Sequence, residues 1–191
     1  MIQHQLEARI FRILSDFDRE LAAVRKPAEL YTFDEKGDRI AIANGSLWGE
    51  DPWQDFEVKL HVEPAPAGRN NYLYLTTGRE GQWDACNPQF EARINGRVMQ
   101  AFDVNHTRMP LDDCGDIEVS LKGYCCGSEL KSPRPFVSAE LRQINTELEQ
   151  LGYDIRVPFE AATLLPAGER EREVALETIA RYTYFAEYVR K

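Results

Sequence analysis

The fold is decided by the stretch Phe90-Glu91-Ala92-Arg93-Ile94-Asn95-Gly96-Arg97-Val98-Met99-Gln100-Ala101-Phe102. The Asn-Gly pair at its centre supplies the two residues with positive φ that a type I′ β-turn requires. The segments on either side have the length of ordinary strands. This stretch therefore predicts a β-hairpin with strands over residues 90–94 and 97–102.

Strand-like alternation extends outward from this hairpin in both directions. Apolar and polar side chains alternate over residues 56–62 and 117–121, and the pair Ile40 and Ile42 shows the same period of two. Clusters of proline and glycine separate these segments, and no helical period lies between them. The pattern predicts a mainly β chain with an antiparallel β-sandwich over residues 29–136.

Helical periods flank the predicted sandwich on both sides. Residues 1–28 predict an N-terminal helix that Pro27 ends, with apolar side chains at Leu6, Ile10, Leu14, Phe17, Leu21 and Val24. Residues 137–191 predict a helical hairpin, with a break or kink near residues 152–158 where a glycine and a proline interrupt the period. Its first apolar seam consists of Val137, Leu141, Ile144, Leu148, Leu151 and Ile155.

The last predicted helix, residues 169–190, carries four aromatic residues near its end: Tyr182, Tyr184, Phe185 and Tyr188. Their spacing of one to three residues prevents them from sharing one helix face. We therefore expect some of them to stay exposed and to favour self-association into a homo-oligomer.

The charge balance narrows the classes of partner. The 191 residues include 23 Lys and Arg against 32 Asp and Glu, a formal net charge of -9 at pH 7. This excess of negative charge argues against nucleic acid and anionic membranes as partners. No apolar run is long enough to span a membrane, and the N-terminus lacks a basic leader followed by an apolar segment. We therefore expect a cytoplasmic protein.

The sequence contains no recognisable set of catalytic residues. His4, His61 and His106 are scattered and form no pattern typical of a zinc site, so no metal ligands and no cofactor are predicted for this chain. His61 falls on the polar side of an alternating strand, which predicts a solvent-facing side chain. Glycosidic chemistry needs two carboxylates held across a cleft, and the sequence singles out no such pair. No catalytic residue is predicted.

Three tryptophans lie in segments between the predicted strands: Trp48, Trp53 and Trp83. Tryptophans in the loops of a sandwich can form flat platforms for sugar rings or anchor an interface. The alternative is that they cover the open ends of the sandwich core. Both interpretations remain open at this level.

A second polar candidate follows the hairpin, where Asp103, Asn105 and His106 cluster at the end of a strand. Asp and Asn side chains commonly cap turns, and this interpretation is favoured. A ligand site or a contact with another domain is the alternative.

Part of the chain resembles a known enzyme family. The run from Tyr74 to Phe90, continuing through Ile94–Gln100 to Asp103–His106, resembles the N-terminal region of bacterial α-mannosidases of glycoside hydrolase family 38. The stretch Trp48–Trp53 resembles the entry into that region, and Tyr153–Leu165 resembles the helical linker that leads to the catalytic barrel. The resemblance covers about residues 40–190, and Pro158 departs from the continuous helix of the family's linker.

The resemblance implies a β-sandwich of jelly-roll or galactose-binding-like type that precedes a catalytic domain. In the family that catalytic domain holds a zinc ion and an Asp nucleophile, and none of its motifs can be placed on this chain. The implied partner is the catalytic domain of the same polypeptide, which this chain would support without being active itself. The competing hypotheses are a stand-alone carbohydrate-binding module and a purely structural interaction domain.

Overall fold

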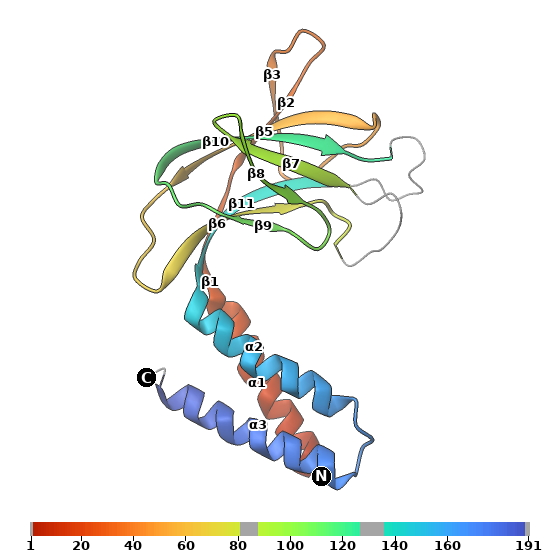
Figure 1. The fold of residues 1–191 in the computed structure, drawn as a ribbon, viewed down its shortest axis with the longest axis vertical. Helices are drawn as coiled ribbons and strands as arrows, with labels where there is room; N and C mark the ends of the chain where they lie inside the picture. The colour runs from red at the N-terminus through yellow and green to blue at the C-terminus, as the bar shows by residue number, and fades with distance from the viewer. Residues whose placement is uncertain (1, 81–87, 127–135, 190–191) are drawn as a thin grey trace. The chain divides into compact units, whose positions relative to one another are not determined.

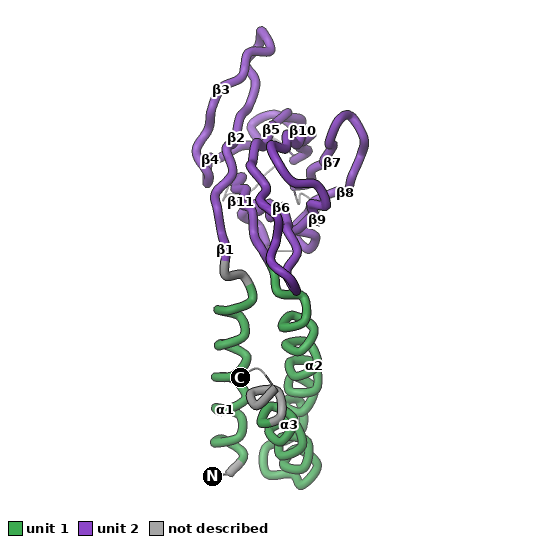
Figure 2. The backbone as a smooth tube through the Cα atoms, turned by 90° about the vertical axis from the view of Figure 1, so that its left-hand side faces the viewer, with its two compact units in different colours: residues 1–23, 144–191 green, residues 24–143 purple. Residues whose placement is uncertain are grey.

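A computed structural model describes residues 2–80, 88–126 and 136–189 of the chain. The chain divides into two compact units, which Figure 2 shows in different colours. Residues 24–143 form the sandwich unit, and residues 1–23 together with 144–191 form the helical unit. The predicted class is confirmed: mostly antiparallel sheets with an N-terminal helix and C-terminal helices.

The larger sheet of the sandwich unit has six strands, and all of its pairings are antiparallel (Figure 1). In spatial order they are β3 (Arg39–Ile42), β2 (Glu29–Phe33), β5 (Trp53–Val62), β10 (Gly115–Tyr124), β7 (Gln89–Ile94) and β8 (Arg97–Phe102). The far end of the β2–β3 hairpin projects beyond the rest of the sheet (Figure 1).

The second sheet has five strands. Its order is β1 (Ala22–Pro27), β11 (Phe136–Asn145), β6 (Arg69–Thr76) and β9 (Arg108–Pro110), and the short β4 (Ser46–Leu47) pairs with β11. The first and last strands of the sandwich unit, β1 and β11, are therefore neighbours.

Alternate side chains from the two sheets meet in one apolar core. Phe56 and Val58 of β5 and Val119 of β10 come from the larger sheet, and Leu73 and Leu75 of β6 come from the other. All five side chains are at most 1% exposed. Strands with alternating apolar and polar residues form a sandwich because each sheet can bury its apolar face only by packing it against another apolar face.

The predicted hairpin is confirmed as β7 and β8. Asn95 and Gly96 have φ values of 51° and 77°, so both turn residues occupy the region that a type I′ turn requires. The ladder pairs Ile94 with Arg97 and Phe90 with Phe102, and a β-bulge interrupts the register between Ala92 and Arg93.

The beginning of the predicted tail is a strand, and the helical prediction for residues 137–144 is wrong. Val137, Ala139 and Leu141 of β11 point into the sandwich core. A step of four, from Val137 to Leu141, fits a strand with period two as well as a helix, and the buried Ala139 between them distinguishes the two. The strand ends at Asn145, whose side chain accepts a hydrogen bond from the N–H of Leu148 and so caps the following helix.

Three helices, α1 (Ile2–Leu21), α2 (Thr146–Thr163) and α3 (Arg170–Val189), form the helical unit. Their shared core includes Ile10, Phe17, Ile155, Leu176 and Ile179. Because α1 ends at Leu21 and residues 22–27 form β1, the prediction that the N-terminal helix continues to Pro27 is wrong. The ring of Pro27 clashes with the preceding residue in a helical conformation and so favours extended backbone there, which suits a strand.

Of the break or kink predicted near residues 152–158, the break is absent, because α2 continues through Pro158 to Thr163. Ile155 and Ala162 are at most 3% exposed and anchor the helix on both sides of the proline. Arg172 of α3 adds hydrogen bonds to this packing: its guanidinium lies 2.6 Å from the carboxylate of Glu7 in α1 and 2.5 Å from the carbonyl oxygen of Leu165.

Within the described part of the chain, no helix combines the length and apolarity needed to cross a membrane.

Candidate functional site

Trp48 lies in the sandwich core and is almost completely buried. Its side chain is 2% exposed, with its ring centroid 5.4 Å from that of Phe56 and 4.8 Å from that of Phe90. The buried indole N–H has no hydrogen-bond partner among the described residues. Of the two interpretations of this tryptophan, the structure supports the one in which it covers the core.

Trp53, five residues further on, is 60% exposed. It is the first residue of β5 and lies directly opposite Tyr124, the last residue of β10. The two rings have centroids 4.7 Å apart and planes inclined by 51°. Lys122 is close to the same indole, with its Nζ 5.4 Å from the ring centroid. Trp53 and Tyr124 are called the aromatic pair below.

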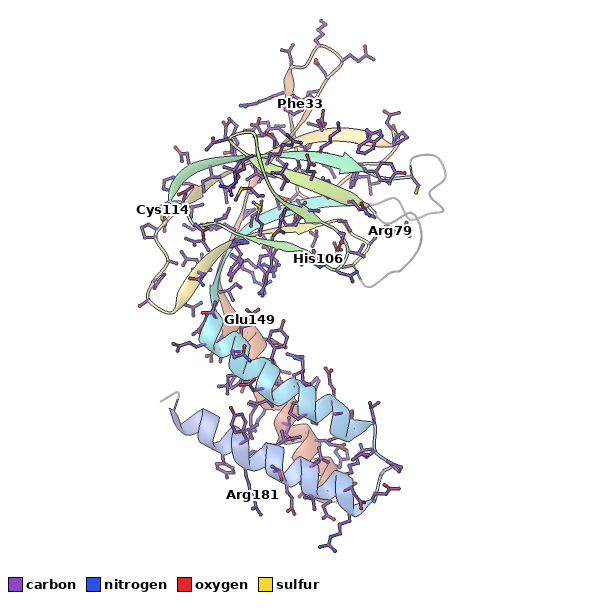
Figure 3. All side chains as sticks on the ribbon, viewed as in Figure 1. Phe33, Arg79, His106, Cys114, Glu149 and Arg181 are labelled. Atoms are coloured by element: carbon purple, nitrogen blue, oxygen red, sulfur yellow. The ribbon has the colours of Figure 1, made fainter. Side chains whose placement is uncertain are left out.

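A cavity of about 600 Å³ adjoins the indole of Trp53 at this end of the sandwich unit. Its lining residues come from β2, β4, β5 and the segments beside them: Thr32, Phe33, Asp34, Glu35, Leu47, Trp48, Glu50, Asp51, Trp53, Gln54 and Asp55. Phe33, labelled in Figure 3, lies at the base of the projecting hairpin. The lining includes five carboxylates and no Lys or Arg among the described residues, and we call it the acidic cavity.

Hydrogen bonds orient the polar side chains of the acidic cavity. The Gln54 side-chain amide donates to Thr32 Oγ1 over 3.1 Å, and the Thr32 hydroxyl donates to the main-chain oxygen of Asp55 over 3.2 Å. Asp34 accepts from the backbone N–H groups of Lys36 and Asp38 and so shapes the tip of the hairpin. These bonds leave the Gln54 carbonyl oxygen in a defined orientation.

Asp103, Asn105 and His106 form the predicted capped turn. Asp103 Oδ1 accepts hydrogen bonds of 2.7 Å from the backbone N–H groups of Asn105 and His106, and His106 Nδ1 lies 3.0 Å from both carboxylate oxygens. Burial alone would raise the pKa of Asp103, but the hydrogen bonds from the His106 ring and the two N–H groups outweigh it and lower that pKa. His106 is exposed and labelled in Figure 3.

The strand register places this turn at the same end of the larger sheet as the aromatic pair. Phe102, just before the turn, pairs with Phe90, which pairs with Gly123, the neighbour of Tyr124. Three strand spacings separate β8 from β5, or roughly 14 Å. The structure therefore brings Trp53 and Asp103 to one end of the sheet without direct contact. Trp83, the remaining aromatic candidate, lies outside the described residues.

The outer face of the larger sheet carries a charged network that the sequence analysis missed. Arg39 donates to Glu57 at 2.8 Å, Lys59 lies 2.5 Å from Glu118, and the Glu57 side chain is only 9% exposed. The hydrogen bond between Lys59 and Glu118 raises the pKa of the lysine and lowers that of the carboxyl group. The alternation along β5 indicated that its charged side chains point outward. Their ion-pair partners could not be predicted in the same way, because they depend on the pairing of β5 with β10 and β2.

A second cavity, of about 510 Å³, lies beside this network and includes His61 and Asp116 in its lining. His61 is 64% exposed, as the alternation predicted, and its Nδ1 lies 2.7 Å from the Asp116 carboxylate. Both signs of charge line this cavity, which favours no single class of ligand. Among the described residues, no group of three or more His, Cys, Asp or Glu side chains is arranged to hold a metal ion.

Comparisons with known proteins give no family. The sequence matches no family model and no curated protein. Among solved structures, the insecticidal crystal protein Cry2Aa aligns with 66% of this chain and 20% of its own length, at 12% identity and a TM-score of 0.33. The CBM51-2 and INT domains of ZmpB from Clostridium perfringens align with 84% of this chain and 42% of their own, at 10% identity and a TM-score of 0.27.

A third structure is the CBM51 domain of a GH95 protein from Clostridium perfringens, in complex with methyl-galactose. It aligns with 60% of this chain and 79% of its own length, at 10% identity and a TM-score of 0.26. Similarity at this level supports no inference about function, so the site must be interpreted from its own geometry.

Proposed function

We propose that this chain is the non-catalytic N-terminal β-sandwich domain of a family 38 α-mannosidase, an enzyme that hydrolyses terminal α-mannosides. Its role is to pack on the catalytic domain and support it. The observation that carries the proposal is the sequence resemblance over about residues 40–190. Zinc and the nucleophile belong to the catalytic domain, so this chain alone is inactive.

The positions of the resembling residues support this proposal. Asn95 and Gly96 have the positive φ of the hairpin turn, and Asp103 caps the turn that follows. Residue identity at such positions is dictated by backbone conformation, so a resemblance there reflects a shared local structure. The other resembling segment, Tyr153–Leu165, falls largely on α2.

Exposed apolar side chains in both units are compatible with a supporting role. Trp53 in the sandwich unit and Phe11 in the helical unit are 60% and 66% exposed. Large exposed apolar side chains are the usual anchors of a domain interface. The same exposed side chains would also fit the alternative of a purely structural interaction domain.

The proposal is tested by mixing the purified chain with a family 38 catalytic domain that lacks its own N-terminal region. We expect a complex in size-exclusion chromatography and a higher melting temperature of the catalytic domain, because binding to the folded state stabilises it. The chain alone should not hydrolyse an aryl α-mannoside with zinc present. Zinc-dependent hydrolysis that one acid-to-amide substitution abolishes, or the absence of a complex, would refute the proposal.

A second candidate function is carbohydrate binding by the chain itself. The specific observation that favours it is the exposure of Trp53 beside Tyr124 and a polar cavity. Saturable binding of a sugar to the isolated chain would support this candidate, whichever protein the chain belongs to.

A further inference from the structure

The geometry points to a binding site for a neutral pyranoside at the aromatic pair, Trp53 and Tyr124, and the adjoining acidic cavity. The sugar ring stacks on the aromatic pair, its hydroxyl groups donate to the carboxylates of the cavity, and anionic sugars bind more weakly than neutral ones. This inference deepens the carbohydrate-binding candidate and does not depend on an α-mannosidase parent.

The aromatic pair supplies the apolar contact. Trp53 and Tyr124 are 60% and 37% exposed although they belong to the regular ladder of the larger sheet. Cross-strand pairing holds both backbones in place, so little conformational freedom is lost when a ligand covers the rings. A pyranose offers a face of C–H groups that matches an aromatic surface, while its edges carry the hydroxyl groups.

The acidic cavity supplies the polar contacts beside the indole. Asp51 and Asp55 line it together with Trp53, and carboxylates accept the hydrogen bonds that sugar hydroxyls donate. Gln54 uses its amide N–H on Thr32, which leaves its carbonyl oxygen as a further acceptor. A volume of about 600 Å³ falls in the usual range of small-molecule sites.

The charge of the lining selects among sugars. Among the described residues, the ionisable side chains that line the acidic cavity are all carboxylates: Asp34, Glu35, Glu50, Asp51 and Asp55. A uronate or a sugar phosphate would bring a further negative charge into this field and lose affinity. Lys122 lies near the indole but is not part of the cavity lining.

The experiment is an NMR titration of the full chain, followed through the indole N–H resonances in the wild type and through saturation transfer from protein to sugar in the Trp53 variants. Methyl α-mannoside, methyl β-galactoside and methyl β-glucoside are each compared with methyl β-glucuronide, which has the glucoside's ring and one carboxylate. We expect a saturable shift of the Trp53 signal with at least one neutral glycoside at ~1–10 mM, and binding of the glucuronide at least about tenfold weaker than that of the glucoside. Trp53→Ala should abolish binding and Trp53→Phe should restore part of it, while Tyr153→Ala, an exposed aromatic in the helical unit, should change nothing.

The double variant Asp51→Asn, Asp55→Asn tests the charge selection. It should narrow the difference between the glucoside and the glucuronide at an unchanged melting temperature, because both side chains are exposed. The inference is overturned if no neutral glycoside gives a saturable shift up to ~100 mM, if Trp53→Ala leaves binding intact, or if the glucuronide binds as well as the glucoside. The titration involves no catalytic domain, so its failure is distinct from failure of the accessory-domain proposal.

Discussion

Gly123 of β10 and Trp48 are in such close contact that a Cβ atom on the glycine would lie 3.1 Å from Cζ3 of the indole. The same atom would lie 3.1 Å from the main-chain oxygen of Gln54 and 3.2 Å from Cε2 of Phe56. The core therefore holds a tryptophan at this point because the facing strand has no side chain there. The contact also explains how Trp48 can be buried in the core.

Gly123→Ala should destabilise the sandwich unit by ~1–3 kcal/mol, because backbone and two rings must move to admit one methyl group. Gly152→Ala is the matched control, since a Cβ there meets nothing within 4 Å and the residue lies in α2. The control should gain roughly 1 kcal/mol from helix propensity. Urea denaturation of both variants measures the difference, and an unchanged midpoint for Gly123→Ala would contradict the packing described.

Gly96→Val should destabilise the chain by ~1 kcal/mol or more, because a β-branched residue fits a φ of 77° poorly. A Cβ at Gly96 meets nothing within 4 Å, so the loss reports backbone strain alone. Asn95→Gly, which keeps the positive φ at the other turn position, serves as the control and should cost less. Thermal melts followed by circular dichroism decide the matter, and equal melting temperatures for wild type and Gly96→Val would count against the turn.

Asp103→Asn should lower stability at neutral pH by ~1 kcal/mol through weaker bonds to the backbone N–H groups of Asn105 and His106. The pKa of Asp103 is lowered in the folded state. Its stabilisation is therefore fully present above the ordinary pKa of about 3.9 and is lost as the pH falls through the lower, folded-state value. The difference in unfolding free energy between wild type and Asp103→Asn should therefore disappear in that acidic range.

Urea denaturation at pH values from 7 into the acidic range measures this difference in unfolding free energy. The control is Asp113→Asn, a change at an exposed carboxylate. A difference that stays constant with pH would show that the carboxylate charge at Asp103 has no role in the turn. His106→Ala should leave the fold intact and cost about one hydrogen bond, ~1 kcal/mol. A metal bound stoichiometrically by wild type and lost in this variant would make the turn a ligand site instead.

Arg39→Ala should destabilise the sandwich unit by ~1–3 kcal/mol, because it removes the 2.8 Å partner of a Glu57 side chain that is 9% exposed. The double variant Arg39→Ala, Glu57→Gln should recover part of the loss, since it removes the buried charge as well. Glu118→Gln, at a side chain 56% exposed, should have the smaller effect. Denaturation at low and high salt measures all three, and an Arg39→Ala variant as stable as wild type would refute the role of the network.

The helical unit should associate with another copy at high concentration through its exposed aromatics. Phe11, Tyr182 and Tyr184 are 66%, 43% and 63% exposed, which confirms that some tail aromatics stay uncovered. Light scattering over a concentration series should show a rising mean mass that the double variant Phe11→Ser, Tyr184→Ser suppresses. A chain that stays monomeric throughout would contradict this prediction.

The features that the sequence predicted well are local. The Asn95-Gly96 turn and the alternation of β5 are each written in a few consecutive residues, so they could be derived without knowing what packs against them. The same alternation places Trp53 outward, because Phe56 and Val58 point inward. The predicted strand began at Phe56 and so left the exposure of Trp53 open, although the same alternation continued back to Trp53 would have indicated it.

The features that the sequence missed depend on distant partners. Trp48 is buried because Gly123, 75 positions away, leaves room for it. Val137 and Leu141 fit both periods, and only pairing of β11 with its neighbours selects the strand. The three-helix assembly joins a segment before the sandwich to two segments after it, and no local pattern shows which apolar faces meet.

The adjacency of β1 and β11 has a thermodynamic consequence for the helical unit. Helices α1 and α2 are joined through residues 24–143, and closing a flexible loop of that length would cost roughly 4 kcal/mol of chain entropy. Once the sandwich unit has folded, both ends of this segment leave from neighbouring strands and most of that cost has already been met. The folded sandwich unit thus lowers the entropic cost of assembling the helices. When the sandwich unit unfolds, the helical unit should lose this stabilisation and unfold in the same transition.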